Sequence, residues 1–289
     1  MKRLFISLAI LAGISLSSCN DSFLEKTPVT DLTENNAFNS YDNFKAFMWP
    51  CYEMFTNNTI RTSLQGFGQD GQYKGDMAAG YFQQKYESGY NEFAYQTVAS
   101  VASGNGWDFK SFIRRVNIML SHIDNSSMTE AQKDHWRAVG YFFHSFWYME
   151  LIDRFGDVPW VDQVLQEDSP EAYGPRVDRK TVADKVLERL QWAEQNIGNF
   201  TSQDGDNTIN QDCVRAVISR FGLREGTWRK YHELGDAEKY LQECVRASEL
   251  LMAAYPTLYT GTDGQPGAGY GEMWTCLLYT SPSPRDAHE

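Results

Sequence analysis

The stretch from residue 136 to residue 151 constrains the fold most, because its apolar residues cover two faces of one helix. One face carries Trp136, Val139, Gly140, Phe143, Trp147 and Leu151, and the other carries Phe142, Phe146 and Met149. A helix that is apolar on two faces is buried between neighbours. The run Phe155-Gly156-Asp157-Val158-Pro159 follows, and glycine and proline commonly end helices. The sequence therefore predicts a central helix with neighbours on both sides.

Apolar residues recur at three- and four-residue steps elsewhere in the chain. These stripes predict helices over residues 109–123, 182–197, 214–228 and 237–252, and one that starts after Ser40. Thr181 with Asp184 resembles a capping box for the helix over 182–197. No alternating strand pattern competes. The sequence therefore predicts a mostly α fold of stacked, tetratricopeptide-like helical hairpins, although no repeat of fixed period is present.

Residues 57–106 differ from the rest in character. They are rich in Gly, Gln, Asn, Ser and Tyr, with few aliphatic residues, and no helical period persists through their first half. Long irregular segments of this kind usually carry function. We therefore predict a long, irregular ligand-binding insertion in the helical domain.

The N-terminus has the pattern of an export signal. Lys2 and Arg3 precede the apolar stretch 4–16, which is too short to span a bilayer comfortably. Leu16-Ser17-Ser18-Cys19 resembles a bacterial lipobox. We expect a signal peptide at 1–18, a lipid anchor on Cys19 and a polar tether over 19–33; the alternative is a plain secretory signal with an incidental cysteine.

The C-terminal residues match a sequence from another source. Cys276 to Asp286 correspond to one reading frame of a transposon-type sequencing adapter. We therefore expect 276–289 to be an artefact and exclude it from fold reasoning. The helical domain is then predicted over 34–275, with the chain an N-terminal fragment whose C-terminal part is missing.

Charge and residue spacing argue against several classes of function. The formal net charge of −12 argues against a nucleic-acid partner, which requires clustered positive charge. Of the three cysteines in the expected domain, two could form one disulfide, but we predict that all three are buried free thiols. Neither a CxxC motif nor the spacing of a zinc site is present. No GxSxG motif occurs. We expect no catalytic residue, metal or cofactor. The cysteines are Cys51, Cys213 and Cys244, and the histidines without metal spacing are His122, His135, His144 and His232.

Two loop motifs fail the test of their context. The run 66–71 matches GxGxxG, but no strand precedes it and no helix opens on it. The run 204–207 resembles the start of a calcium loop, but Ile209 and Arg215 stand where that loop needs Gly and Glu. We interpret the first as a loop and the second as a solvated turn.

Acidic residues near the end of the central helix allow two interpretations. Glu150 and Asp153 lie three residues apart, and a carboxylate pair can hydrolyse glycosides. Arg154 beside them favours a structural ion pair. Asp157 follows Gly156 in a tight turn, where an Asp commonly bonds its own backbone.

Four blocks of the sequence resemble the SusD/RagB family of outer-membrane nutrient-uptake lipoproteins of Bacteroidetes. The most specific block is Trp136-Arg137-Ala138 through Tyr141-Phe142-Phe143, continued by Leu151 to Pro159, which is similar to the family signature "R-A-x-x-Y-F … L-x-x-x-F-G-D-V-P". The other blocks are Cys19 to Glu25 with Pro28 and Thr33-Glu34, Ile113 to Asn117, and Val214 to Trp228 with Ala237 to Tyr255. Departures include Cys51, Gly140 and the composition of the insertion, and they concern specificity.

The resemblance implies a surface-exposed outer-membrane lipoprotein without catalytic activity. Such a protein would sit as a lid on a TonB-dependent, SusC-like transporter and capture a glycan for import. Peptide capture by the same architecture is the alternative within the family. A lipid-anchored glycoside hydrolase and a purely structural helical scaffold are the alternatives outside it.

Aromatic and polar residues in the insertion are the candidate ligand contacts. Aromatic faces stack on sugar rings, and carboxylates and amides hydrogen-bond to hydroxyl groups. The structural alternative is that these tyrosines pack the insertion onto the helices, and Trp107 is expected to pack. The candidate binding residues are Asp70, Tyr73, Asp76, Tyr81, Tyr86 and Tyr90.

Overall fold

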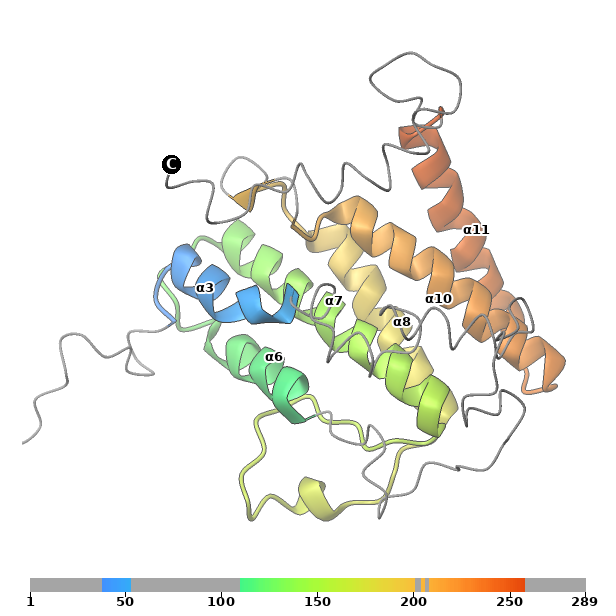
Figure 1. Ribbon diagram of the computed structural model, residues 1–289, viewed down its shortest axis with the longest axis horizontal. Helices are drawn as coiled ribbons and strands as arrows, with labels where there is room; N and C mark the ends of the chain where they lie inside the picture. Colours follow the sequence, from blue (N-terminus) through green and yellow to red (C-terminus); the bar gives the residue numbers. More distant parts are fainter. Residues whose placement is uncertain (1–37, 53–109, 201–203, 206–207, 258–289) are drawn as a thin grey trace, which may run out of the picture.

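The computed structural model describes residues 38–52, 110–200, 204–205 and 208–257. Within these ranges the structure is helical, and the only extended pairing is an isolated bridge between Val158 and Val177. This confirms the predicted mostly α fold (Figure 1). The helices are α3 (Tyr41–Tyr52), α6 (Lys110–His122), α7 (Glu130–Phe155), α8 (Arg179–Asn196), α10 (Gln211–Tyr231) and α11 (Ala237–Ala254), with a short 3-10 helix, η4 (Pro170–Tyr173).

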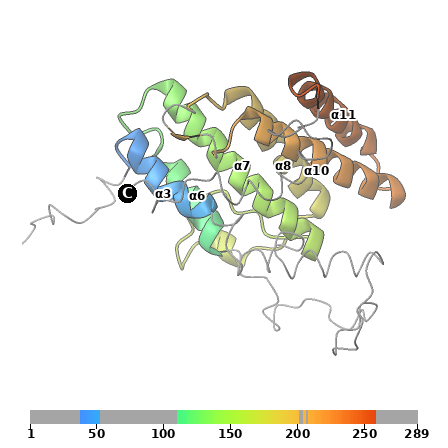
Figure 2. The same cartoon turned by 45° about the horizontal axis from the view of Figure 1, so that its top comes forward.

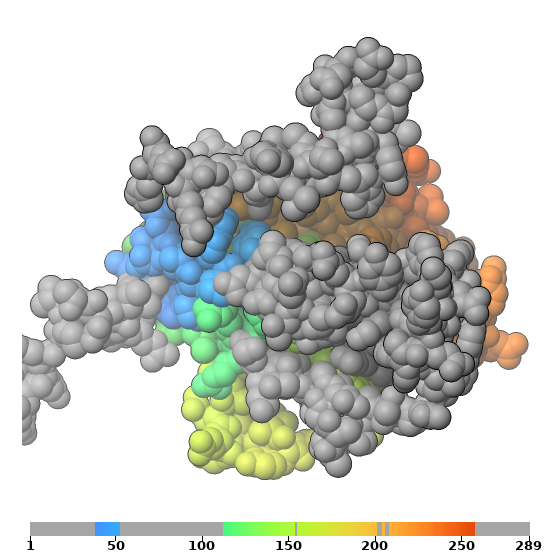
Figure 3. All heavy atoms as spheres, viewed as in Figure 1, coloured from blue at the N-terminus to red at the C-terminus, as the bar shows by residue number. Residues whose placement is uncertain are grey.

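The helices lie in a row in which most neighbours in space are neighbours in sequence. α7 packs against α6 and α3 on one side and α8 on the other, α8 packs against α10, and α10 packs against α11. Figure 2 shows this order from α3 to α11. The predicted stacking of helical hairpins is therefore confirmed. The connection between α7 and α8 projects from one edge of the row (Figure 3).

The central helix α7 is buried on both of its predicted faces. Its N-terminus has a complete capping box, in which Thr129 and Gln132 exchange hydrogen bonds. Its C-terminus ends at Gly156, whose φ of 68° suits glycine. Trp136, Phe142 and Trp147 are all less than 9% exposed. Because α7 is apolar on two faces, other helices pack on both sides of it.

Two predictions about the start of α8 are wrong. The N-cap is Asp178, whose Oδ1 accepts the backbone N–H of Thr181 at 2.9 Å, so Thr181 and Asp184 form no capping box. Asp184 lies inside the helix and binds Tyr240 instead. Asp157 does not bond its own backbone, because its Oδ1 accepts the N–H of Arg179 at 2.8 Å. The bridge between residues 158 and 177 brings these two segments together.

The apolar stripe expected for residues 237–252 packs only in part. Leu241 and Cys244 meet glycines of α10, as predicted. Val245 and Met252 are 55% and 63% exposed, whereas Tyr240 is fully buried. Glycines in α10 decide this packing. A Cβ on Gly222 would lie 2.5 Å from the carbonyl oxygen of Tyr240, so the two backbones meet there, with Tyr240 facing α10.

The described cysteines form no disulfide. Cys51 is buried, and Cys213 and Cys244 are partly buried. The predicted thiols are therefore confirmed, although only one of them is fully enclosed. None of the described helices combines the length and the apolar character needed to cross a membrane.

Candidate functional site

The residues predicted to contact ligand lie outside the described residues. These are Asp70, Tyr73, Asp76, Tyr81, Tyr86 and Tyr90. The anchor residue Cys19, the segment 276–289 and Trp107 also lie outside them. These assignments stay predictions. The structure does describe the two helix ends between which the insertion runs, at Tyr52 and Lys110.

Aromatic contacts fix the end of α3 to the central helix. The Tyr52 ring packs edge-on against Phe143 at 5.0 Å and stacks on Trp49 at 5.1 Å. Its hydroxyl oxygen accepts the backbone N–H of Ile209 at 3.1 Å, and burial raises the pKa of this hydroxyl. Trp49 remains 45% exposed. The insertion therefore starts from a fixed point that also presents an exposed aromatic ring.

Asn117 of α6, which is part of the resemblance, and Tyr148 of α7 bind the start of the α7–α8 connection. The Asn117 side chain, 1% exposed, donates from Nδ2 to the carbonyls of Val161 and Gln163 at 3.1 and 3.0 Å. The Tyr148 hydroxyl donates to the Pro159 carbonyl at 3.0 Å and accepts the N–H of Val161 at 2.7 Å. These bonds hold the connection against α6 and α7.

The two acidic residues near the end of α7 are held in ion pairs. The shortest contact joins Asp153 Oδ2 to Arg224 Nη1 at 2.5 Å, and Glu150 lies 3.8 Å from the same nitrogen. The predicted ion pair therefore exists, but its described partners are Arg224 of α10 and Arg179 of α8, whose Nη2 lies 3.8 Å from Asp153 Oδ1. The side chain of Arg154 lies outside the described residues. Burial raises the pKa of Asp153, against the opposing effect of Arg224.

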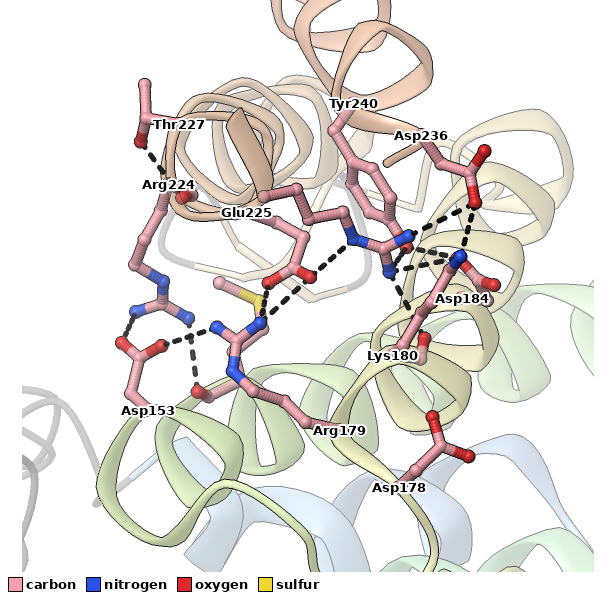
Figure 4. A network of polar contacts seen from close by, with 12 residues as sticks. Asp153, Asp178, Arg179, Lys180, Asp184, Arg224, Glu225, Thr227, Asp236 and Tyr240 are labelled. Atoms are coloured by element: carbon pink, nitrogen blue, oxygen red, sulfur yellow. Dashed lines mark hydrogen bonds and ion pairs between the residues drawn. The ribbon is translucent and has the colours of Figure 1, made fainter. Parts of the chain in front are cut away.

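A larger polar network ties α8, α10 and α11 together (Figure 4). Glu225 and Arg229 are each 1% exposed, and Arg229 Nε donates to Glu225 Oε1 at 2.8 Å. Arg179 Nη1 lies 2.7 Å from Glu225 Oε2. The Tyr240 hydroxyl donates to Asp184 at 2.5 Å and accepts from Arg229 Nη2 at 2.9 Å. The four-residue spacing of Glu225 and Arg229 is typical of an ion pair along one helix, so the sequence could have indicated this pair. The contacts give the network a structural role, because it joins three helices.

The histidines pack. His144 is fully buried, and its Nε2 lies 2.9 Å from the Val161 carbonyl, so this nitrogen carries the donated proton. Desolvation lowers the pKa of His144 and of His135. Among the described residues, no cluster of His, Cys, Asp and Glu has a geometry that could hold a metal ion.

Two adjoining cavities lie where α8 ends, α10 begins and α11 ends. Their volumes are about 380 and 430 Å³, and Gln211 and Arg215 line both. We call the pair the corner cleft. The first cavity is also lined by His135, Phe200, Asp204, Ile209, Asn210 and Asp212, and the second by Gln191, Glu194, Gln195, Glu243 and Arg246.

Buried Glu194 organises the second cavity. Its side chain is 8% exposed, and it accepts from Arg215 Nε at 2.9 Å and from Arg246 Nη2 at 2.6 Å. Burial acts to raise its pKa, but the hydrogen bonds from Arg246 and Arg215 prevail and lower it. Gln211 Nε2 donates to the Glu194 carbonyl at 2.9 Å. Two guanidinium groups and an amide are therefore held in fixed positions along the cleft.

Asp204 closes the first cavity and is not part of a solvated turn as predicted. Its side chain is 4% exposed, accepts the hydroxyl proton of Tyr41, and lies 3.3 Å from Lys45 Nζ. Tyr41 and Lys45 come from α3, and His135 Nε2 of α7 lies 3.7 Å from Asp204 Oδ2. The sequence spacing could not show these contacts. Burial and this hydrogen bond raise the pKa of Tyr41. Asp206 and Asn207 lie outside the described residues.

A comparison with protein families shows the family to which the chain belongs. Residues 22–223 match the profile of a SusD-like family described as "Starch-binding associating with outer membrane". The chain belongs to this SusD-like family. The match includes the residues of the predicted insertion. A search of curated proteins found no match.

Solved structures of SusD-like proteins share the fold. A SusD homologue from Bacteroides thetaiotaomicron is 15% identical, with a TM-score of 0.55 over 78% of this chain and 43% of its own. A SusD-like carbohydrate binding protein from Bacteroides vulgatus is 18% identical, with a TM-score of 0.53 over 78% and 47%. A SusD-like protein from Bacteroides fragilis is 18% identical, with a TM-score of 0.53 over 77% and 41%. The chain thus spans less than half the length of these relatives.

Proposed function

We propose that this protein is a lipid-anchored outer-membrane subunit that captures oligosaccharide or polysaccharide. It delivers the glycan to a TonB-dependent, SusC-like transporter and does not cleave it. The observation that carries this proposal is the family match over 22–223, in a family described as starch-binding and associated with the outer membrane. The lipobox-like run ending at Cys19 supports the anchor.

Ligand contact is proposed for the insertion between α3 and α6. Its tyrosines would stack on sugar rings, while Asp70 and Asp76 would accept hydrogen bonds from sugar hydroxyls. The end of α3 is fixed by the contacts of Tyr52 with Phe143 and Ile209. A fixed attachment reduces the ordering cost of binding, since the end of the binding segment is already placed.

The ion pairs of Glu150 and Asp153 support a protein that binds glycan without hydrolysing it. A glycosidase needs one carboxyl group that can donate a proton and a second that can act as base or nucleophile. Glu150 and Asp153 share the guanidinium of Arg224, which holds them in a salt bridge between two helices. Capture of the glycan and its delivery to the transporter then require only non-covalent contacts with the glycan, which form and break.

Affinity electrophoresis tests the proposal. The exported chain, produced without residues 1–19, would be run through gels containing starch, laminarin, dextran, inulin or xylan, with a peptide pool as competitor. We expect one polysaccharide to retard the protein and Tyr73→Ala with Tyr86→Ala to reduce the retardation. The control is Tyr173→Ala, which removes a ring that is 79% exposed on η4. No retardation by any polysaccharide, or release of reducing sugar, would overturn the proposal.

A further inference from the structure

We propose that the corner cleft is a second saccharide contact, which binds further sugar residues of the glycan captured by the insertion. The inference rests on the proposed glycan-binding function. It differs from the predicted site in the insertion because it is built by the ends of α8, α10 and α11.

The charges that line the cleft are paired locally, which favours a neutral ligand. Glu194 binds Arg215 and Arg246, and Arg246 also pairs with Glu243 at 2.9 Å. Asp212 lies 3.1 Å from Arg215. Each acidic side chain therefore has a basic partner, and neither a bare cation nor a bare anion meets an unopposed charge. A neutral polyol fits such a surface, because each hydroxyl both donates and accepts a hydrogen bond.

Two glutamines offer unused amide groups to such a polyol. Gln191 and Gln195 line the second cavity from α8, one turn apart. Within the described part of the chain, neither side chain makes a hydrogen bond or an ion pair. Each amide has two N–H donors and a carbonyl oxygen. Adjacent sugar hydroxyls could therefore be bound at two points by one side chain.

One aromatic ring lines the first cavity, and a second is bonded to a residue that lines it. Phe200 lines the first cavity, and its ring is 4.7 Å from that of His135. Tyr255 is 63% exposed, and its hydroxyl donates to Asp212 at 2.8 Å. This bond ties an exposed ring to a residue that lines the cleft. Rings held in place in this way can stack on sugar with little loss of side-chain entropy.

A buried polar atom also lies on the cleft. Asp204 lines the first cavity with a side chain that is 4% exposed, and its Oδ1 receives no hydrogen bond within the described residues, although Lys45 Nζ is 3.3 Å away. This oxygen therefore has a charge partner but no hydrogen bond within the described residues. A hydroxyl group that reached it would add a hydrogen bond to the ion pair.

The cleft adjoins the point where the insertion begins. Ile209 lines the first cavity, and its N–H donates to the hydroxyl of Tyr52, the last residue of α3. A glycan held by the insertion near this helix end could therefore extend into the cleft. This continuity is why we assign the cleft to the same glycan rather than to an unrelated ligand.

The test is the double variant Gln191→Ala with Gln195→Ala. Alanine favours helix, so α8 is preserved. With the polysaccharide that retards the wild-type chain most, we expect about five- to tenfold weaker binding, the effect of losing one or two net hydrogen bonds. The control Gln242→Ala removes an exposed glutamine of α11 outside the cleft, whose one side-chain bond among the described residues is to Glu238, and should leave binding unchanged.

Hydrogen exchange gives a second measurement. Saturating glycan should slow amide exchange in the α8–α10 connection and in the first turn of α10. A double variant within twofold of wild type, without such protection, overturns the cleft assignment while the proposed function stands. Failure of the wild-type chain to bind any polysaccharide would overturn both.

Discussion

Replacing Glu225 by glutamine should destabilise the protein strongly. Glu225 and Arg229 are each 1% exposed, and Glu225 also pairs with Arg179. The substituted amide would keep the shape of the side chain but remove the charge that offsets the buried guanidinium of Arg229. Breaking a buried pair on one side costs about 3–5 kcal/mol. For a domain of this size, that loss lowers Tm by roughly 10 °C.

Urea denaturation followed by circular dichroism at 222 nm measures this change. The matched control is Glu130→Gln, which breaks the Lys133–Glu130 pair, where the glutamate side chain is 84% exposed. Exposed pairs contribute less than about 1 kcal/mol. If Glu225→Gln costs no more than the control, the network in Figure 4 does not tie α8 to α10 as argued. Replacing Glu225 and Arg229 together by leucine and methionine should recover part of the loss, since the buried guanidinium of Arg229 is removed with its partner and Arg179 keeps its contact with Asp153 at 3.8 Å.

Two further changes test the helix packing and the buried histidine. The folded-state pKa of His144 lies below its ordinary value of 6.5 because of burial, so its neutral form stabilises the fold above pH 6.5 and this stability is lost as pH falls. His144→Gln should therefore show a smaller fall in the free energy of unfolding between pH 7 and pH 5, and an unchanged pH profile would contradict this assignment. Gly222→Ala places a Cβ against the backbone of α11 and should cost about 1–3 kcal/mol in urea denaturation. The control Gly174→Ala meets ordinary contacts at 3.5 Å and should change little, and equal effects of the two would refute the close approach of α10 and α11.

The central helix could be predicted from sequence because its signal is local. The two apolar faces of 136–151 and the Gly-Asp-Val-Pro stop lie within one segment. In the structure both faces are buried, and α7 ends directly before Gly156. The packing of α11 could not be predicted in the same way. Its expected stripe includes Leu241 and Cys244, which meet α10, and also Val245 and Met252, which are exposed. The glycines of α10 decide which part of the stripe packs.

The corner cleft could not be predicted from the spacing of residues either, because its contacts join residues far apart in the sequence. Glu194 meets Arg246 across 52 residues, and Asp204 meets Tyr41 across 163. Charged residues at such separations have no periodic relation, so each is most simply interpreted as solvated surface. The start of α8 was misplaced by three residues because Asp178 and Thr181 are both acceptable caps, and the bridge at Val177 decides between them.

The fixing of α3 to the row of helices has a consequence for how such proteins diverge. The carbonyls of Asn39 and Phe47 accept hydrogen bonds from Ser127 and Arg115, and Tyr41 binds Asp204. α3 is thus anchored by contacts that do not involve residues 53–109, which connect it to α6. The free energy of closing a connection grows only with the logarithm of its length, by about 0.6 kcal/mol for each doubling. Mutation could therefore rewrite or lengthen the intervening segment at little cost to the scaffold, so that sequence differences can accumulate there on an unchanged helical frame.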